Sequence, residues 1–105
     1  MLFRSLDQHI AANLHESAFG IEALARCMHA DRSQLFRKSK EVLGQSPSDY
    51  LREARLAHGR RLLEQAAGSV SEVAYASGFD SLSSFTRAFK TRYGVPPSQV
   101  REHAA

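Results

Sequence analysis

The stretch that decides the fold is "SLSSFTRAFKTRYG", residues 81–94, which has a close counterpart in "DRSQLFRKSKEVLG", residues 31–44. In each stretch an apolar residue lies nine positions before a glycine, an Arg follows that apolar residue by two positions and a Lys by five. Apolar residues at four-residue steps with basic residues between them are typical of a helix that has one buried side and one exposed side. The chain therefore contains the same basic, amphipathic helix twice.

The repeat extends to the short segments that precede these two helices. Leu24-Ala25 aligns with Val73-Ala74 at an offset of 49 residues, and after one extra residue near Phe79-Asp80 the offset becomes 50. Each copy predicts a short helix, a tight turn and a second helix with a basic exposed side, which is the arrangement of a helix-turn-helix unit. Two copies in register favour this interpretation much more than one copy would.

Helical periodicity dominates the chain, and no segment alternates as a strand would. We therefore predict an all-α fold of seven helices, in which two helix-turn-helix units are joined by a long central helix. The expected helices run over residues 2–15, 21–28, 32–43, 47–65, 71–77, 82–93 and 97–103. The expected organisation is a single domain, with residues 1–45 as the first unit, residues 46–65 as the linker helix and residues 66–105 as the second unit.

Residues with strong positional preferences support these boundaries. Asp31 followed by Gln34 predicts a capping box at the start of a helix, and Gly44 predicts its end. Ser46-Pro47 predicts the start of the central helix, since Pro is favoured at the first helical position. His29 is expected to adopt an unusual backbone angle in a turn rather than to bind a ligand.

Composition and charge narrow the class of function. Fourteen Lys and Arg residues against eleven Asp and Glu residues give a net charge of +3, with 43% hydrophobic residues. The basic residues concentrate in the two repeated helices, which favours a polyanionic partner. A single cysteine, the lack of a membrane-spanning apolar run and the lack of a signal peptide predict a cytoplasmic protein that does not enter a membrane. The abrupt ends of the sequence are equally compatible with a piece of a longer protein.

The sequence contains no pattern typical of an enzyme or of a metal site. There is no glycine-rich phosphate loop, nucleophile elbow or HExxH helix. Cys27 has no second thiol, and the histidines are not spaced as metal ligands: His9, His15, His29, His58 and His103. We therefore expect no catalytic residue, no cofactor and no metal ion.

The chemistry of the repeated helices fits double-stranded DNA. A helix fits the major groove, where the side chains of its N-terminal half reach base edges. The predicted base contacts lie away from the apolar stripe: they are Arg32, Ser33, Phe36, Arg37, Leu82, Ser83, Thr86 and Arg87. The predicted phosphate contacts are Lys38, Lys40, Lys90 and Arg92. For Phe36 the alternative to a base contact is packing in the core. For the four predicted phosphate contacts the alternative is an ordinary solvated helix face without a role in binding.

The central helix sets the expected spacing of the two units. Its 19 residues correspond to about 28 Å at 1.5 Å per residue. Successive major grooves on one face of DNA lie about 34 Å apart. We therefore expect the two basic helices to enter successive major grooves, so that a monomer reads an asymmetric site.

The chain resembles the DNA-binding domain of the AraC/XylS family of bacterial transcription regulators over residues 6–101. The strongest match is "VSEVAYASGFDSLSSFTRAFKTRYGVPPSQVR", and the first copy matches through "L.R..K" at residues 35–40 and "G.SP" at residues 44–47. The resemblance implies base reading by the third and sixth helices, at the eight positions named above. It also implies transcription regulation, with a sensing, dimerising or two-component domain elsewhere in the full protein; RNA polymerase is a further candidate partner.

Three residues depart from the family pattern. Ser39 stands where an apolar residue such as Phe is usual, Gly59 where Ala is usual, and Val100 where Tyr is usual. A glycine inside a helix costs about 1 kcal/mol relative to alanine. We expect the first unit to pack less firmly, and to be more mobile, than the second.

A second hypothesis assigns the basic helices to protein binding. In this alternative the chain is a helical interaction module that docks an acidic partner, such as an RNA polymerase subunit or a receiver domain. Helix-turn-helix folds serve both purposes, since a fold does not by itself determine function.

Overall fold

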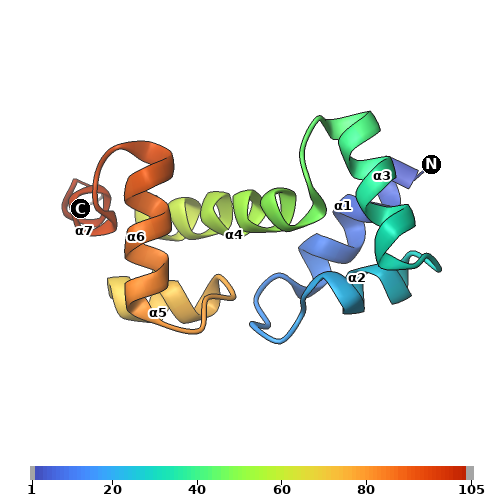
Figure 1. Ribbon diagram of the computed structural model, residues 1–105. Helices are drawn as coiled ribbons and strands as arrows, with labels where there is room; N and C mark the ends of the chain where they lie inside the picture. The colour runs from blue at the N-terminus through green and yellow to red at the C-terminus, as the bar shows by residue number, and fades with distance from the viewer. Residues whose placement is uncertain (1, 104–105) are drawn as a thin grey trace. The chain divides into compact units, whose positions relative to one another are not determined.

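The computed structural model describes residues 2–103, with side chains from residue 5 onward. This part of the chain forms seven helices and no strand, so the predicted all-α fold is confirmed (Figure 1). The helices are α1 (Leu2–Asn13), α2 (Ile21–Cys27), α3 (Arg32–Leu43), α4 (Pro47–Glu64), α5 (Val70–Ala76), α6 (Leu82–Tyr93) and α7 (Pro97–Glu102). The side chains of Leu2 and Phe3, in the helix expected over residues 2–15, lie outside the described residues.

The predicted cap of α3 is confirmed by its hydrogen bonds. The Asp31 carboxylate accepts a hydrogen bond of 2.8 Å from the Gln34 backbone N–H, and the Asp31 backbone N–H donates to the Gln34 side chain at 3.0 Å. Gly44 ends α3 with a φ of 74°, in the left-handed region that favours glycine. His29 also has a positive φ, of 56°, as expected for a residue in the turn between α2 and α3.

The start of α5 differs from the prediction. The helix begins at Val70, and Ser69 is its cap. The Ser69 hydroxyl accepts a hydrogen bond from the Glu72 backbone N–H, and the Glu72 carboxylate accepts one from the Ser69 backbone N–H. Ser69 and Glu72 have the spacing of a capping box, so the sequence itself contains the signal for a start at Val70, one residue before the predicted start.

The described residues divide into two compact units. Unit 1 comprises residues 2–14 and 18–54, and unit 2 comprises residues 15–17 and 55–103. The boundary falls inside α4, between Ala54 and Arg55. Each unit therefore contains one pair of helices of the repeat, α2 and α3 in unit 1 and α5 and α6 in unit 2.

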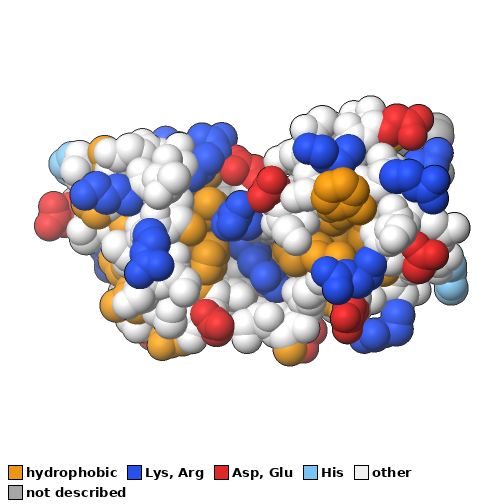
Figure 2. All heavy atoms as spheres, viewed as in Figure 1, with side chains coloured by type: hydrophobic (Ala, Val, Ile, Leu, Met, Phe, Trp, Pro, Cys, Tyr) orange, Lys and Arg blue, Asp and Glu red, His pale blue; other side chains and the backbone are white. Residues whose placement is uncertain are grey.

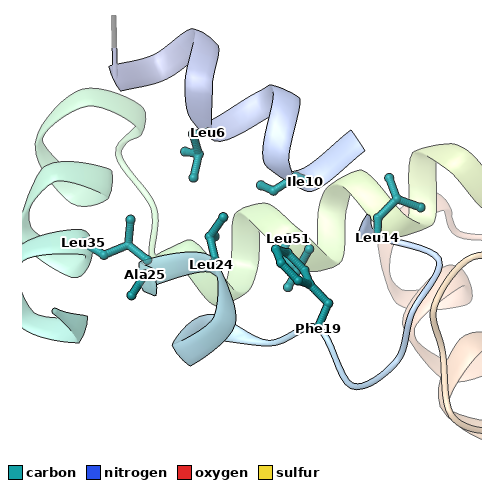
Figure 3. Close-up of a cluster of buried hydrophobic side chains, with 8 residues drawn as sticks. All are labelled: Leu6, Ile10, Leu14, Phe19, Leu24, Ala25, Leu35 and Leu51. Carbon is teal, nitrogen blue, oxygen red and sulfur yellow. The ribbon is translucent and has the colours of Figure 1, made fainter. Parts of the chain in front are cut away.

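Unit 1 buries a mainly aliphatic core to which α1, α2, α3 and the first part of α4 contribute. The core residues are Leu6, Ile10, Leu14, Phe19, Leu24, Ala25, Leu35 and Leu51 (Figure 3). The Tyr50 hydroxyl of α4 also donates a hydrogen bond to the Asp7 carboxylate of α1. These contacts hold α3 by its inner side, which carries Leu35.

Unit 2 is built around aromatic rings. Its fully buried residues include Phe85 and Phe89 of α6, which pack with Val73 and Ala74 of α5. The ring centroids of Phe85 and Phe89 lie 5.5 Å apart, and that of Phe89 lies 4.7 Å from the Tyr93 ring. Tilted contacts at these distances are favourable for aromatic pairs, so the three rings form a continuous row along the inner side of α6.

Ser39 takes a different role from the one its position suggested. Its side chain is 3% exposed, and its hydroxyl donates a 2.7 Å hydrogen bond to the backbone carbonyl of Gln45. A small hollow of about 20 Å³ lies beside it, lined mainly by apolar side chains. The hydroxyl therefore ties α3 to the segment that follows it, at the position where unit 2 has the Phe89 ring.

Candidate nucleic-acid interface

All the residues of α3 that the sequence predicts to contact DNA are exposed on its outer side. Leu35 and Ser39 are the buried residues of this helix. The exposed ones include Arg32, Ser33, Phe36, Arg37, Lys38 and Lys40. Phe36 leaves 50% of its surface exposed, so its ring is not a core residue. The first turns of α3 thus present an aromatic ring between two arginines.

The outer side of α6 has the same organisation. Phe85 and Phe89 are buried, and the exposed residues include Leu82, Ser83, Arg87, Lys90 and Arg92. Thr86 is half-buried, so less of its side chain is accessible to a ligand than is the case for the exposed residues around it. Leu82 is 40% exposed. Each of the two helices therefore combines cations with one exposed apolar side chain near its N-terminus.

The helix positions of the candidates agree between the two units. Arg32 and Leu82 are the first residues of α3 and α6, and Arg37 and Arg87 are the sixth residues. Figure 2 shows Lys and Arg side chains on the exposed surface over both helices. The sequence repeat is thus also a repeat of helix positions.

The cations differ in what they contact. Within residues 5–103, neither Arg37 nor Arg87 has a hydrogen bond or an ion pair. The Arg32 guanidinium lies 3.8 Å from the Glu22 carboxylate of α2, and both side chains are largely exposed. The guanidinium carbon of Arg92 lies 4.9 Å from the centroid of the Tyr93 ring. Arg37 and Arg87 therefore keep all their side-chain donors available to a ligand, as does the exposed Arg26 of α2, which also has no such partner in the described residues.

The base-contact candidates of unit 1 lie together around one surface hollow. It lies between the N-terminal halves of α3 and α4, and its walls carry hydroxyls as well as cations. The residues that line it are Ile21, Arg32, Ser33, Phe36, Arg37, Ser46, Pro47 and Ser48. The structure thus brings all four predicted base contacts of unit 1 to one surface.

Two exposed residues of the short helices were missed from the sequence. Arg26 of α2 lines a second surface hollow together with Arg32 and Glu22. Tyr75 of α5 is 54% exposed and lies at the position that corresponds to Arg26, at the offset of 49 residues. The first helix of a helix-turn-helix unit crosses the DNA backbone. The repeat offset relates the two positions to each other, but only the packing of α2 on α3 places Arg26 beside Arg32.

Other kinds of site are not seen in the described part of the chain. Among residues 5–103, no group of three or more His, Cys, Asp or Glu side chains is placed to hold a metal ion. Within residues 2–103, no helix has the length and apolar composition needed to cross a membrane.

Known sequences similar to this chain include helix-turn-helix proteins. A family model described as "Helix-turn-helix domain" matches residues 24–103. The chain is 37% identical over 87 residues to the HTH-type transcriptional regulator MtrA of Neisseria gonorrhoeae. The matched region covers 83% of this chain and 29% of MtrA. The chain is 39% identical over 82 residues to the regulator GlxA of Rhizobium meliloti, covering 78% of the chain and 25% of the relative. The chain thus spans between a quarter and a third of the length of these relatives.

Solved structures match nearly the whole chain. A transcriptional regulator with an AraC-type DNA-binding domain from Chromobacterium violaceum has a TM-score of 0.89 at 29% identity, and the match covers 99% of this chain and 92% of that one. The DNA-binding domain of AdpA, solved in complex with a target DNA, has a TM-score of 0.87 at 29% identity, covering 97% and 90%.

Proposed function

The chain belongs to the AraC-type family of helix-turn-helix transcription regulators, and we propose that it binds double-stranded DNA sequence-specifically through α3 and α6. The observation that carries this proposal is the pair of exposed basic helix faces whose residues occupy matching helix positions. The side of each helix that faces away from the core is thus the side that carries hydrogen-bond donors.

The proposed base contacts divide by chemistry. Arg37 and Arg87 each have a guanidinium without an intramolecular partner in the described residues, and such a group can donate two hydrogen bonds to O6 and N7 of guanine. Phe36 and Leu82 are exposed apolar residues in the first two turns of the same helices, and each is suited to the methyl group of thymine. Arg32, Ser33, Ser83 and Thr86 complete the set of proposed base contacts.

The remaining cations are proposed to contact phosphates. Lys38, Lys40, Lys90 and Arg92 lie farther along α3 and α6 than the proposed arginine contacts to bases, and we add Arg26 of α2 to this group. Such contacts supply affinity and register without sequence information, and each makes binding weaker as the salt concentration rises.

The proposed DNA site spans two successive major grooves. The 18 residues of α4 correspond to about 27 Å, to be compared with about 34 Å between successive major grooves. Because both helix-turn-helix units belong to one chain, a monomer is expected to read an asymmetric site. We place this activity in the cytoplasm, with RNA polymerase as a further partner of the full regulator and with no cofactor or catalytic step in this domain.

Binding of the purified chain to a labelled mixed-sequence duplex tests the proposal against the protein-docking alternative. The duplex should bind and should compete far better than an acidic polypeptide of the same charge, such as polyglutamate. Affinity should fall steeply with salt, because counterions are released from DNA on binding. Equal competition by polyglutamate would contradict DNA binding as the function of the basic helices.

A further inference from the structure

The part of α4 that belongs to unit 2 comes unusually close to the helix-turn-helix pair at Gly59. A Cβ atom at this position would lie 2.8 Å from Cε1 and 3.0 Å from Cζ of Phe85, and 2.9 Å from the hydroxyl oxygen of Ser77. Real Cβ atoms essentially never show contacts shorter than 3.0 Å. The backbone of α4 is therefore closer to Phe85 than even an alanine would allow.

The atoms that face Gly59 have little freedom to move away. Phe85 and Ser77 are both completely buried. The Phe85 ring is held between two other rings, with centroid distances of 5.2 Å to Phe79 and 5.5 Å to Phe89. Close-packed interiors transmit such strain to the backbone instead of absorbing it. A side chain added at position 59 would thus displace α6 rather than only a side chain.

The displaced part of α6 is the part that carries the proposed base contacts. Phe85 is the fourth residue of α6, and Leu82, Ser83 and Thr86 belong to the same turns of the helix. Ser77 is the C-cap of α5 and begins the turn that leads to α6. Gly59 therefore contacts the helix-turn-helix pair at the two places that fix the N-terminal half of α6.

We infer that Gly59 is a positioning residue for base reading by unit 2, because it sets the distance between α4 and the N-terminal half of α6. This inference rests on the proposed function. Helix propensity alone predicts that glycine at position 59 only destabilises α4 relative to alanine. The inference instead assigns the missing side chain a structural role. The absence of a side chain is what lets α6 lie as close to α4 as it does in this chain.

The substitutions that should make room for a side chain at position 59 follow from the atoms that it would meet. Phe85→Leu removes the two ring atoms, and Ser77→Ala removes the hydroxyl oxygen. The buried Ser77 hydroxyl has no hydrogen-bond partner within the described residues, so its removal breaks no hydrogen bond. The two substitutions together should therefore make room for the Cβ of an alanine at position 59.

The test uses binding sites selected from a random duplex pool. The wild-type chain is selected first, and Arg37→Ala and Arg87→Ala then assign each enriched block of bases to unit 1 or unit 2. Selection is repeated with Gly59→Ala, at a temperature where circular dichroism shows a folded protein. Gly20→Ala is the matched control, because a Cβ there meets no atom within 4 Å. Val73→Ala is the second control, since it weakens the core of unit 2 without adding atoms behind α6.

The inference predicts that Gly59→Ala keeps the unit 1 block and loses or changes the unit 2 block. Its affinity for the wild-type site should fall by about tenfold or more, as expected when a two-hydrogen-bond contact to a base is misplaced, with the salt dependence unchanged. Gly59→Ala combined with Phe85→Leu and Ser77→Ala, which removes all three atoms that the added Cβ would meet, should recover the wild-type block. Both controls should retain it.

Two outcomes would overturn the inference. One is a folded Gly59→Ala chain that selects the wild-type unit 2 block; the other is a Val73→Ala chain that loses this block to the same extent. If Gly59→Ala does not fold, the triple variant decides, because a recovered fold with an altered unit 2 block would contradict the role of the close contacts at Gly59. Failure of the proposed function is distinct from all of these, since the wild-type chain would then enrich no block at all.

Discussion

Replacement of Arg87 by alanine separates base reading from general attraction to DNA. Arg87 is exposed and has no hydrogen bond or ion pair within the described residues. Substitutions at such sites usually change the free energy of unfolding by less than about 0.5 kcal/mol, and alanine is the best helix former. The fold should therefore be unchanged, so that any change in affinity reports the contact with DNA.

The expected size of the effect follows from the chemistry of the contact. A two-hydrogen-bond contact between arginine and guanine contributes about 1–3 kcal/mol of discrimination, which corresponds to a loss of about 5- to 150-fold in affinity for the selected site. A random duplex should lose much less. Lys90, a proposed phosphate contact of the same helix, is the matched comparison: Lys90→Ala should weaken both duplexes by the same factor and reduce the salt slope by about 0.9.

Fluorescence anisotropy with both duplexes over a series of salt concentrations measures these quantities. Arg87→Lys adds a sharper test, because lysine keeps the charge but lacks the planar fork of arginine. It should bind the random duplex as the wild-type chain does and bind the selected site more weakly. Equal losses on both duplexes for Arg87→Ala, together with a reduced salt slope, would refute base reading by Arg87.

Three further predictions concern stability, measured by urea denaturation. Ser39→Ala should destabilise unit 1 by about 1 kcal/mol, because a buried hydrogen bond to a backbone carbonyl is lost; unchanged stability would show that this bond contributes nothing. Burial and the hydrogen bond to Asp7 raise the pKa of Tyr50 from 10.0 to about 12. The folded chain thus holds this proton more tightly than the unfolded chain, so stability should fall as the pH rises from 10 to 12, and Tyr50→Phe should flatten that fall. Burial, and to a lesser extent neighbouring cations, lower the pKa of His58 from 6.5, so unit 2 should lose stability as the pH falls below 6.5; a His58→Gln chain with the same acid dependence would contradict this.

The local features of the fold were predictable because short segments determine them. The capping box of Asp31 and Gln34 and the glycine that ends α3 are set by residues that are neighbours in the sequence. The register of the two copies is also a property of the sequence, and it placed Arg37 and Arg87 at matching helix positions. The exposed side of each recognition helix follows from the position of its apolar stripe.

The features that were missed depend on tertiary contacts. Helix propensity assigns Gly59 a cost, whereas its effect depends on the Phe85 ring of another helix. Ser39 was interpreted as a weak point in the packing, but its hydroxyl bonds to the carbonyl of Gln45. Arg26 lies on α2, and its place beside Arg32 follows only from how α2 packs on α3. The greater mobility expected of unit 1 stays a prediction, which equal hydrogen-exchange protection of both units would contradict.

Selection of binding sites for the wild-type chain from a random duplex pool tests the central claim most directly. If α3 and α6 read successive major grooves, the enriched sequences should contain two blocks of bases whose centres lie about 10–10.5 bp apart. Arg37→Ala should remove one block and Arg87→Ala the other. A pool without an enriched motif, or a single block that both substitutions abolish, would contradict a chain that reads DNA with two helices.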